Sequence, residues 1–175
     1  MVSRVSVGGA AGARGVGFQD EVFAWIACWM LAEQSLPRML LPGAVVRVGA
    51  QTGLELDDVA AQSKTGGMVA CQVKAGLGLG SAPDSPLAGA LDQALAQYLV
   101  GIPGGGRRPR RGADVLAIVT DMTAPAIVRR DLAAAISRTG SQPPGTPLNW
   151  QLTEGQREAL EVAVGHLRRP VGTAR

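Results

Sequence analysis

The amino-acid sequence predicts an α/β protein with a central mixed β-sheet flanked by helices, and three observations lead to this fold class. The chain has 175 residues, 46% of them hydrophobic, which is enough for the core of one domain. Segments with helical and strand periodicity follow in the order helix, three strands, helix, strand and two helices. The first strands are hairpin-like and the last is reached through a helix, which favours antiparallel and parallel pairing in one sheet.

The first predicted element is an amphipathic helix that begins near Gly17 and ends near Gln34 to Ser35, before Pro37. Residues 1–16 are rich in small residues, and we expect them to form a flexible N-terminus. Apolar side chains recur at the spacing of one helix face, so this face is expected to pack in the core. The face, which includes a tryptophan pair, comprises Phe18, Val22, Trp25, Ile26, Trp29 and Met30.

Three strand-like segments follow the first helix, at residues 45–49, 55–62 and 68–75. The second and third are separated by a short Gly-rich turn, so we expect them to form a hairpin. The later elements are a helix over 87–100, a buried strand over 114–120 and helices over 124–138 and 153–167. Thr153 and Gln156 have the spacing of a capping box at the start of the last helix.

The composition argues against several classes of protein. The formal net charge of +3 is compatible with a polyanionic partner without requiring one. Cys28 and Cys71 lie in apolar runs and are expected to be buried thiols, and His166 is the only histidine, so a zinc site or a Ser-His-Asp triad is poorly supported. No apolar run approaches the ~20 residues of a membrane span, and the N-terminus lacks a signal-peptide layout. We therefore expect a cytoplasmic protein.

The residues that suggest chemistry lie in the predicted hairpin. Gln72 and Lys74 alternate along one strand and therefore share a face, whereas the apolar residues between them face the other way. Burying such a polar pair is unfavourable unless another polar group meets it. Asp58 on the neighbouring strand supplies that group. Asp57 is the alternative, because only one of two adjacent residues can face the pair; the apolar residues that follow favour Asp58.

An Asp early in one strand, a tight turn and a strand ending in Gln-x-Lys resemble the core of the PD-(D/E)XK nuclease superfamily. The preceding helix is similar to the first helix of that family, which often brings a Glu into the site, here Glu21. The Gln form of the motif is similar to Mrr-like enzymes and to nuclease effector domains of bacterial antiphage systems. The resemblance covers residues 17 to about 121 and implies a restriction-endonuclease-like fold, with one nuclease domain over 17–170.

The resemblance also implies a metal site and a catalytic lysine. Mg²⁺, for which Mn²⁺ can substitute, prefers hard oxygen ligands and activates a water molecule for attack on a phosphodiester. Lys74 would orient that water or stabilise the charge that develops on the phosphate. The expected oxygen ligands come from Asp58, Gln72, the Val73 backbone carbonyl and Glu21.

Further candidate substrate contacts lie outside the hairpin. Gln93 and Gln97 are one helical turn apart and would touch the site or its substrate. A basic loop between the second helix and the last strand would contact phosphates without reading base sequence. Its arginines are Arg107, Arg108, Arg110 and Arg111.

The resemblance thus implies a metal-dependent endonuclease that cleaves double-stranded DNA, and the absence of a separate base-reading module in the sequence leads us to expect low sequence specificity. Such an enzyme would harm its host if unregulated, so we expect an N-terminal effector domain of a larger protein, controlled by a sensor or ATPase domain or by homo-oligomer formation. An antiphage (antiviral defence) role is implied by the resemblance alone. RNA as the substrate, an inactive nuclease-like fold that serves for nucleic-acid binding or oligomerisation, and a generic α/β domain all stay open.

Overall fold

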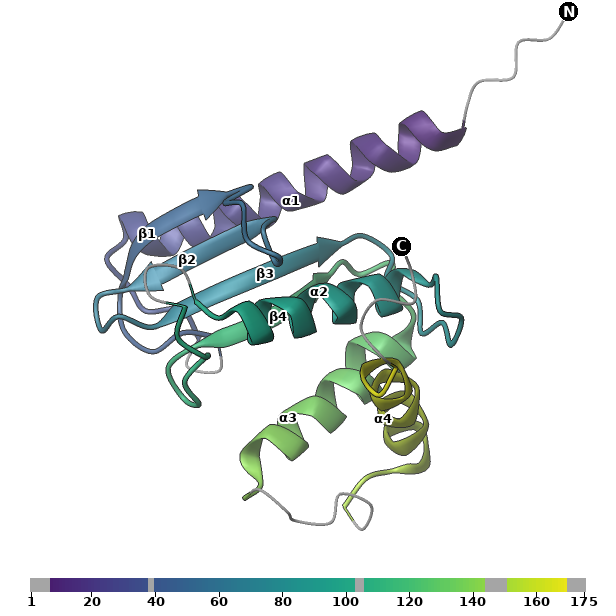
Figure 1. Ribbon diagram of the computed structural model, residues 1–175. Helices are drawn as coiled ribbons and strands as arrows, with labels where there is room; N and C mark the ends of the chain where they lie inside the picture. Colours follow the sequence, from purple (N-terminus) through teal and green to yellow (C-terminus); the bar gives the residue numbers. More distant parts are fainter. Residues whose placement is uncertain (1–6, 38–39, 103–105, 144–150, 170–175) are drawn as a thin grey trace, which may run out of the picture. The chain divides into compact units, whose positions relative to one another are not determined.

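The computed structural model describes residues 7–37, 40–102, 106–143 and 151–169 of the chain. The α/β class and the mixed sheet flanked by helices are confirmed (Figure 1). In chain order the elements are α1 (Val7–Leu31), β1 (Val45–Ala50), β2 (Val59–Ser63), β3 (Met68–Lys74), α2 (Pro86–Val100), β4 (Val115–Thr120), the π-helical segment η1 (Ile127–Leu132), α3 (Ala133–Ser141) and α4 (Glu154–Leu167).

Within the described residues, four strands form one sheet in the order β1-β2-β3-β4. The pairs β1–β2 and β2–β3 are antiparallel, which confirms the predicted hairpin. Its turn is closed by a hydrogen bond from the Gly66 N–H to the Ser63 carbonyl (2.9 Å), and the positive φ of 78° at Gly66 is a conformation that glycine adopts without strain. The chain reaches β4 through α2, as a crossover to the far side of β3 requires.

The chain divides into two compact units. Unit 1 comprises Met1–Ala75 and Ala96–Val119, and unit 2 comprises Gly76–Leu95 and Thr120–Arg175. One nuclease domain over residues 17–170 stays a prediction. All of the predicted site residues except Gln93 belong to unit 1.

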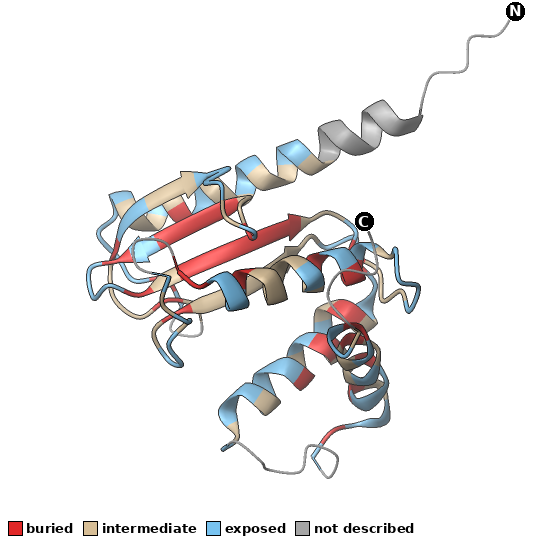
Figure 2. Ribbon diagram, in the orientation of Figure 1, coloured by how far each residue is buried: buried red, intermediate tan, exposed pale blue. Residues whose placement is uncertain are grey.

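The core of unit 1 lies between α1 and one face of the sheet. Residues Val69, Cys71 and Val73 alternate along β3 and are buried in this core together with Ile26 of α1. The other face of β3 therefore carries Met68, Ala70, Gln72 and Lys74. Figure 2 shows β2 and β3 as the most uniformly buried strands. Both faces of the hairpin are thus screened from water over most of its length.

The first helix differs from its prediction at both ends. It begins at Val7 instead of Gly17 and ends at Leu31. Residues 7–16, which were expected to belong to a flexible N-terminus, are part of this helix, and residues 1–6 lie outside the described part of the chain. No proline interrupts residues 7–16, but glycines outnumber alanines there, so intrinsic helix propensity does not explain why the helix continues upstream of the amphipathic stretch.

Two expectations about side chains on α1 were also wrong. Trp25 is 44% exposed and Cys28 is exposed, whereas Phe23 packs against the core. Ile26, only 2% exposed, marks the centre of the buried stripe, and the adjacent Trp25 is rotated by about 100° around the helix axis. Trp25 instead makes an edge-to-face contact with Trp29, with ring centroids 6.0 Å apart.

The other elements follow their predictions closely, with three exceptions. The strand over 114–120 was expected to be buried, but β4 is only half-buried along its whole length. The strand expected over 55–62 begins only at Val59, and the helix expected over 124–138 starts as η1 and continues as α3 to Ser141. The capping box is confirmed, since Gln156 and Thr153 exchange side-chain-to-backbone hydrogen bonds. Within the described ranges, none of the helices has both the length and the apolar character that crossing a membrane requires.

Candidate active site at the end of the hairpin

Asp58 and Gln72 meet at the open end of the β2–β3 hairpin. Val59 pairs with Cys71, so extending the antiparallel register by one residue places Asp58 opposite Gln72. The Gln72 side-chain Nε2 donates a hydrogen bond to Asp58 Oδ2 (2.5 Å), and the Val73 backbone N–H donates to the same oxygen (2.7 Å). The carboxylate of Asp58, and not that of Asp57, is therefore the one in contact with Gln72.

The backbone of Asp58 is fixed as well as its side chain. Its carbonyl oxygen accepts a hydrogen bond from the Gln51 N–H (3.3 Å) and another from the side-chain Nε2 of Gln19 on α1 (2.9 Å). Sequence reasoning missed Gln19, because a side-chain contact to a backbone 39 residues away leaves no periodic signal. Gln19 therefore links α1 to the backbone of the site.

The site contains an unusual buried oxygen. Gln72 is only 2% exposed, and its Oε1 atom has no hydrogen-bond partner within the described residues. Leaving a buried acceptor unpaired costs about 1–3 kcal/mol. Both hydrogen bonds to the Asp58 carboxylate reach Oδ2, which leaves Oδ1 able to take a further ligand. Two hard oxygen atoms with unused acceptor capacity therefore belong to this Asp–Gln pair.

Lys74 and Glu21 are placed differently with respect to this pair. Lys74 is the last residue of β3, is half-buried and shares the Gln72 face of the strand. Glu21 is exposed on α1, where Gln19 makes the contact to Asp58. Among the described residues, no group of three or more His, Cys, Asp or Glu side chains is arranged to hold a metal ion. A cation here would depend on amide and backbone oxygens besides Asp58.

Cys71 lies on the opposite face of β3, and the charge of the same carboxylate affects its thiol. Burial and the negative charge of Asp58 together raise the pKa of the Cys71 thiol to about 12. The thiol therefore stays protonated at neutral pH and is a poor nucleophile, as expected for a buried structural cysteine.

Gln97 is a structural residue, which corrects its expected role as a substrate contact. It is 1% exposed, and its Oε1 accepts hydrogen bonds from the backbone N–H groups of Glu55 (2.9 Å) and Leu56 (3.3 Å). Its Nε2 donates to the Gly101 carbonyl (2.6 Å). The side chain thus fixes the loop before β2 to the end of α2. Gln93 is half-buried in unit 2, and its contact with substrate stays a prediction.

The basic loop is organised around a buried carboxylate that the sequence analysis did not single out. The side chain of Asp114 is fully buried, and its oxygens accept hydrogen bonds from Arg107 (2.5 and 3.0 Å) and from the backbone and side chain of Arg110 (2.7 and 3.3 Å). The Met68 N–H donates to the same carboxylate (3.0 Å). Arg107 and Arg110 are therefore partly neutralised. Arg108, Arg110 and Arg111 are exposed.

Asp114 should make the free energy of unfolding depend on pH in the acidic range. Burial by itself raises the pKa of this carboxyl, but the hydrogen bonds from Arg107, Arg110 and Met68 outweigh it and hold the pKa below its ordinary value. The stabilisation is complete above the unfolded-state pKa of about 4 and is lost as the pH falls below it. We expect Asp114→Asn to lower the free energy of unfolding by about 2 kcal/mol at pH 7.

Urea unfolding at pH 7 and pH 3 measures both effects. The gap between wild type and Asp114→Asn should shrink at pH 3, because the wild-type carboxylate is by then losing its charge-dependent contribution. Asp84→Asn is the control, since Asp84 is an exposed carboxylate. Equal stability of wild type and Asp114→Asn at pH 7 would contradict the assigned role.

Comparison with known proteins gives no family for this chain. No protein-family model matches it, and no match was found among curated proteins or solved structures. Any functional conclusion therefore rests on the chain's own residues.

Proposed function

We propose that this chain is a Mg²⁺-dependent endonuclease domain of the PD-(D/E)XK type, with a restriction-endonuclease-like fold, that hydrolyses double-stranded DNA with low sequence specificity. The observation that carries the proposal is the meeting of Asp58 and Gln72 at the end of the hairpin, with a buried and unpaired Gln72 Oε1. Among the described residues this oxygen has no hydrogen-bond partner, and the proposed cation would bind to it.

The chemistry of the donor set fits Mg²⁺. Asp58 Oδ1 and Gln72 Oε1 are hard oxygens, and the Val73 carbonyl is a third candidate on the same strand. When bound, the ion would polarise the phosphate and make a water molecule more acidic. Asp58 is the only carboxylate of this pair, so we expect modest metal affinity. Glu21 stays a candidate for a further contact through water.

The protein's own residues would position the reacting groups. The Val73 N–H and the Gln72 amide fix one oxygen of Asp58 and so orient the other. Lys74, on the same strand face as Gln72, would place a positive charge where negative charge develops on the phosphate. The exposed Arg108 and Arg111 would add phosphate contacts that are independent of base sequence.

In the cell, we propose that the domain acts as a cytoplasmic antiphage effector within a larger protein or a homo-oligomer, switched on by a sensor or ATPase partner. The physical reason is that no separate base-reading module is evident in the sequence. Without one, cleavage would have to be limited by regulation instead of recognition.

A second function is favoured by two observations. The Gln72 amide donates a hydrogen bond to Asp58, as a neutral structural pair would, and the described residues contain no cluster of three acidic or other metal-binding side chains. The same fold could then be catalytically inactive and serve for nucleic-acid binding or oligomerisation.

A plasmid-nicking assay separates the two functions. The purified chain is incubated with supercoiled plasmid in increasing Mg²⁺ or Mn²⁺, with EDTA as the control. The nuclease predicts nicked and linear products that require the metal. DNA binding without any cleavage at any metal concentration would instead support the inactive fold, and a matched single-stranded RNA substrate tests the choice between DNA and RNA.

A further inference from the structure

A cleft of about 740 Å³ opens on unit 1, over the strand residues at the turn end of the sheet. Its base includes a row of residues that pair across three strands, Arg47 on β1, Gln62 on β2 and Met68 on β3. Met68 belongs to the same face of β3 as Gln72 and Lys74, the face turned away from the α1 core. The cleft and the candidate active site therefore share one surface of the sheet.

Small side chains in the sheet explain why the cleft forms. The row next to Arg47, Gln62 and Met68 is formed by Gly49, Ala60 and Ala70, which are paired across the same three strands. These residues have the smallest side chains, so the sheet surface is low between the row that contains Gln62 and the Asp58–Gln72 pair. Two of them, Gly49 and Ala60, line the cleft.

Arg47 supplies most of the positive charge of the cleft, because the Asp114 carboxylate partly neutralises Arg107. Arg47 and Arg107 are its charged lining residues, and no acidic side chain lines it within the described part of the chain. Arg47 is exposed, and Arg107 is held in place by two hydrogen bonds to Asp114. A guanidinium that is already fixed loses little conformational freedom when it binds an anion. Leu54, Ile102 and Met68 add apolar surface to the same cleft.

We propose that this cleft binds a nucleoside phosphate, with the phosphate on Arg47 and Arg107 and the base against the apolar residues. Arginine suits phosphate because its planar donors match two phosphate oxygens. The volume lies within the ~300–1,000 Å³ typical of small-molecule sites. The proposal rests on the proposed nuclease function, so the ligand is a nucleotide of the DNA strand whose base is turned out of the duplex. It would lie about 13 Å from the Gln72 row, since Met68 is four strand residues from Gln72.

Binding measured in EDTA tests this cleft separately from cleavage. Fluorescence anisotropy gives the affinity for a labelled 20-base-pair duplex, and calorimetry gives the affinity for free dAMP. We expect Arg47→Ala to weaken duplex binding by about 10-fold and to reduce the salt dependence by about one ion, whereas Arg47→Lys retains part of the affinity. Arg157→Ala, an exposed arginine on α4, is the matched control.

The outcomes are distinguishable. An Arg47-dependent loss for the duplex supports the cleft with a DNA nucleotide as its ligand, and the same loss for dAMP alone supports it with a free nucleotide. Unchanged affinity of Arg47→Ala for both ligands, or an equal loss in Arg157→Ala, would overturn the proposal. If the proposed nuclease function is wrong and the cleft proposal is right, plasmid cleavage is absent while Arg47-dependent binding persists. Circular dichroism confirms that each variant is folded.

Discussion

Lys74→Ala is expected to slow plasmid cleavage by about 100- to 1,000-fold, the loss typical of removing one group that stabilises charge in a transition state. The substitution removes the only positive side chain on the Gln72 face of β3 within the described strand. Duplex binding in EDTA should change by less than about 3-fold, because binding at the cleft depends on other residues. Initial rates of supercoiled-plasmid loss at saturating Mg²⁺ measure the effect.

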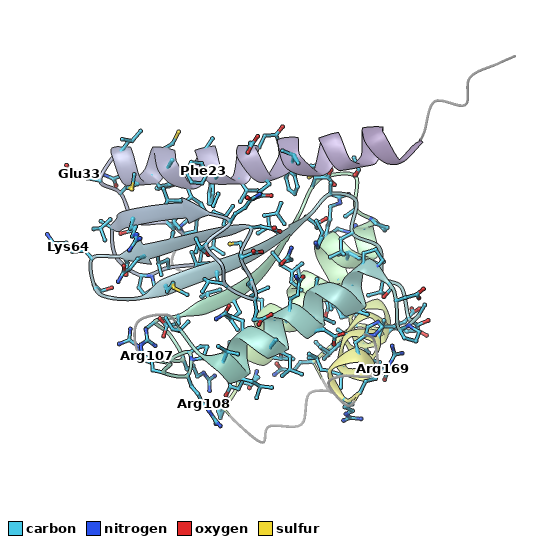
Figure 3. All side chains as sticks on the ribbon, turned by 45° about the horizontal axis from the view of Figure 1, so that its top comes forward. Phe23, Glu33, Lys64, Arg107, Arg108 and Arg169 are labelled. Carbon is cyan, nitrogen blue, oxygen red and sulfur yellow. The ribbon has the colours of Figure 1, made fainter. Side chains whose placement is uncertain are left out.

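The chain supplies a matched control for this experiment, because its only other lysine is Lys64. Lys64 is exposed at the turn between β2 and β3 and points away from the sheet (Figure 3). Lys64→Ala removes the same charge from the same hairpin and should leave the rate unchanged. Equal loss in both variants would point to general electrostatics, and full activity of Lys74→Ala would remove Lys74 from the mechanism.

Asp58→Asn is expected to reduce cleavage by at least about 1,000-fold at low millimolar Mg²⁺, with partial recovery at high metal concentration. The variant keeps the shape of the side chain and loses the single negative charge of the Asp–Gln pair. Charge stabilisation by a bound cation is worth several kcal/mol, which corresponds to this factor. The measurement is a metal titration of the cleavage rate.

Asp57→Asn is the internal control for that titration. Asp57 and Asp58 are adjacent and half-buried, but only the Asp58 carboxylate bonds to Gln72 and Val73. Asp57→Asn should therefore keep the wild-type metal dependence. A stronger defect in Asp57→Asn than in Asp58→Asn would reverse the assignment. Thermal melts exclude the explanation that either variant is simply unfolded.

The parts of the structure that could be predicted from the sequence depend on local patterns. The hairpin, and with it the approach of Asp58 to Gln72, follows from the two-residue period of strands and from a short glycine turn. The capping box at Thr153 is equally local. The geometry follows in each case from a pattern within one short stretch of chain: Asp58 and Gln72 are 14 residues apart and are joined by a single hairpin turn, and Thr153 and Gln156 are three residues apart.

The parts that could not be predicted depend on contacts between distant residues. The Gln97 side chain accepts hydrogen bonds from backbone N–H groups 42 and 41 residues away. The Asp114 carboxylate accepts hydrogen bonds from Arg107, Arg110 and the first residue of β3. Neither arrangement has a repeat or a composition that marks it. A glutamine or arginine that satisfies a buried partner looks the same in the sequence as one that contacts a ligand.

The environments of the two cysteines have a practical consequence for solution experiments. Cys28 is exposed on α1, whereas Cys71 is buried and its raised pKa suppresses the thiolate that maleimides attack. The native chain therefore offers a single position for a fluorophore or spin label without any engineering. A dye attached there would report on the helix that carries Gln19, and release of the second thiol would mark global unfolding.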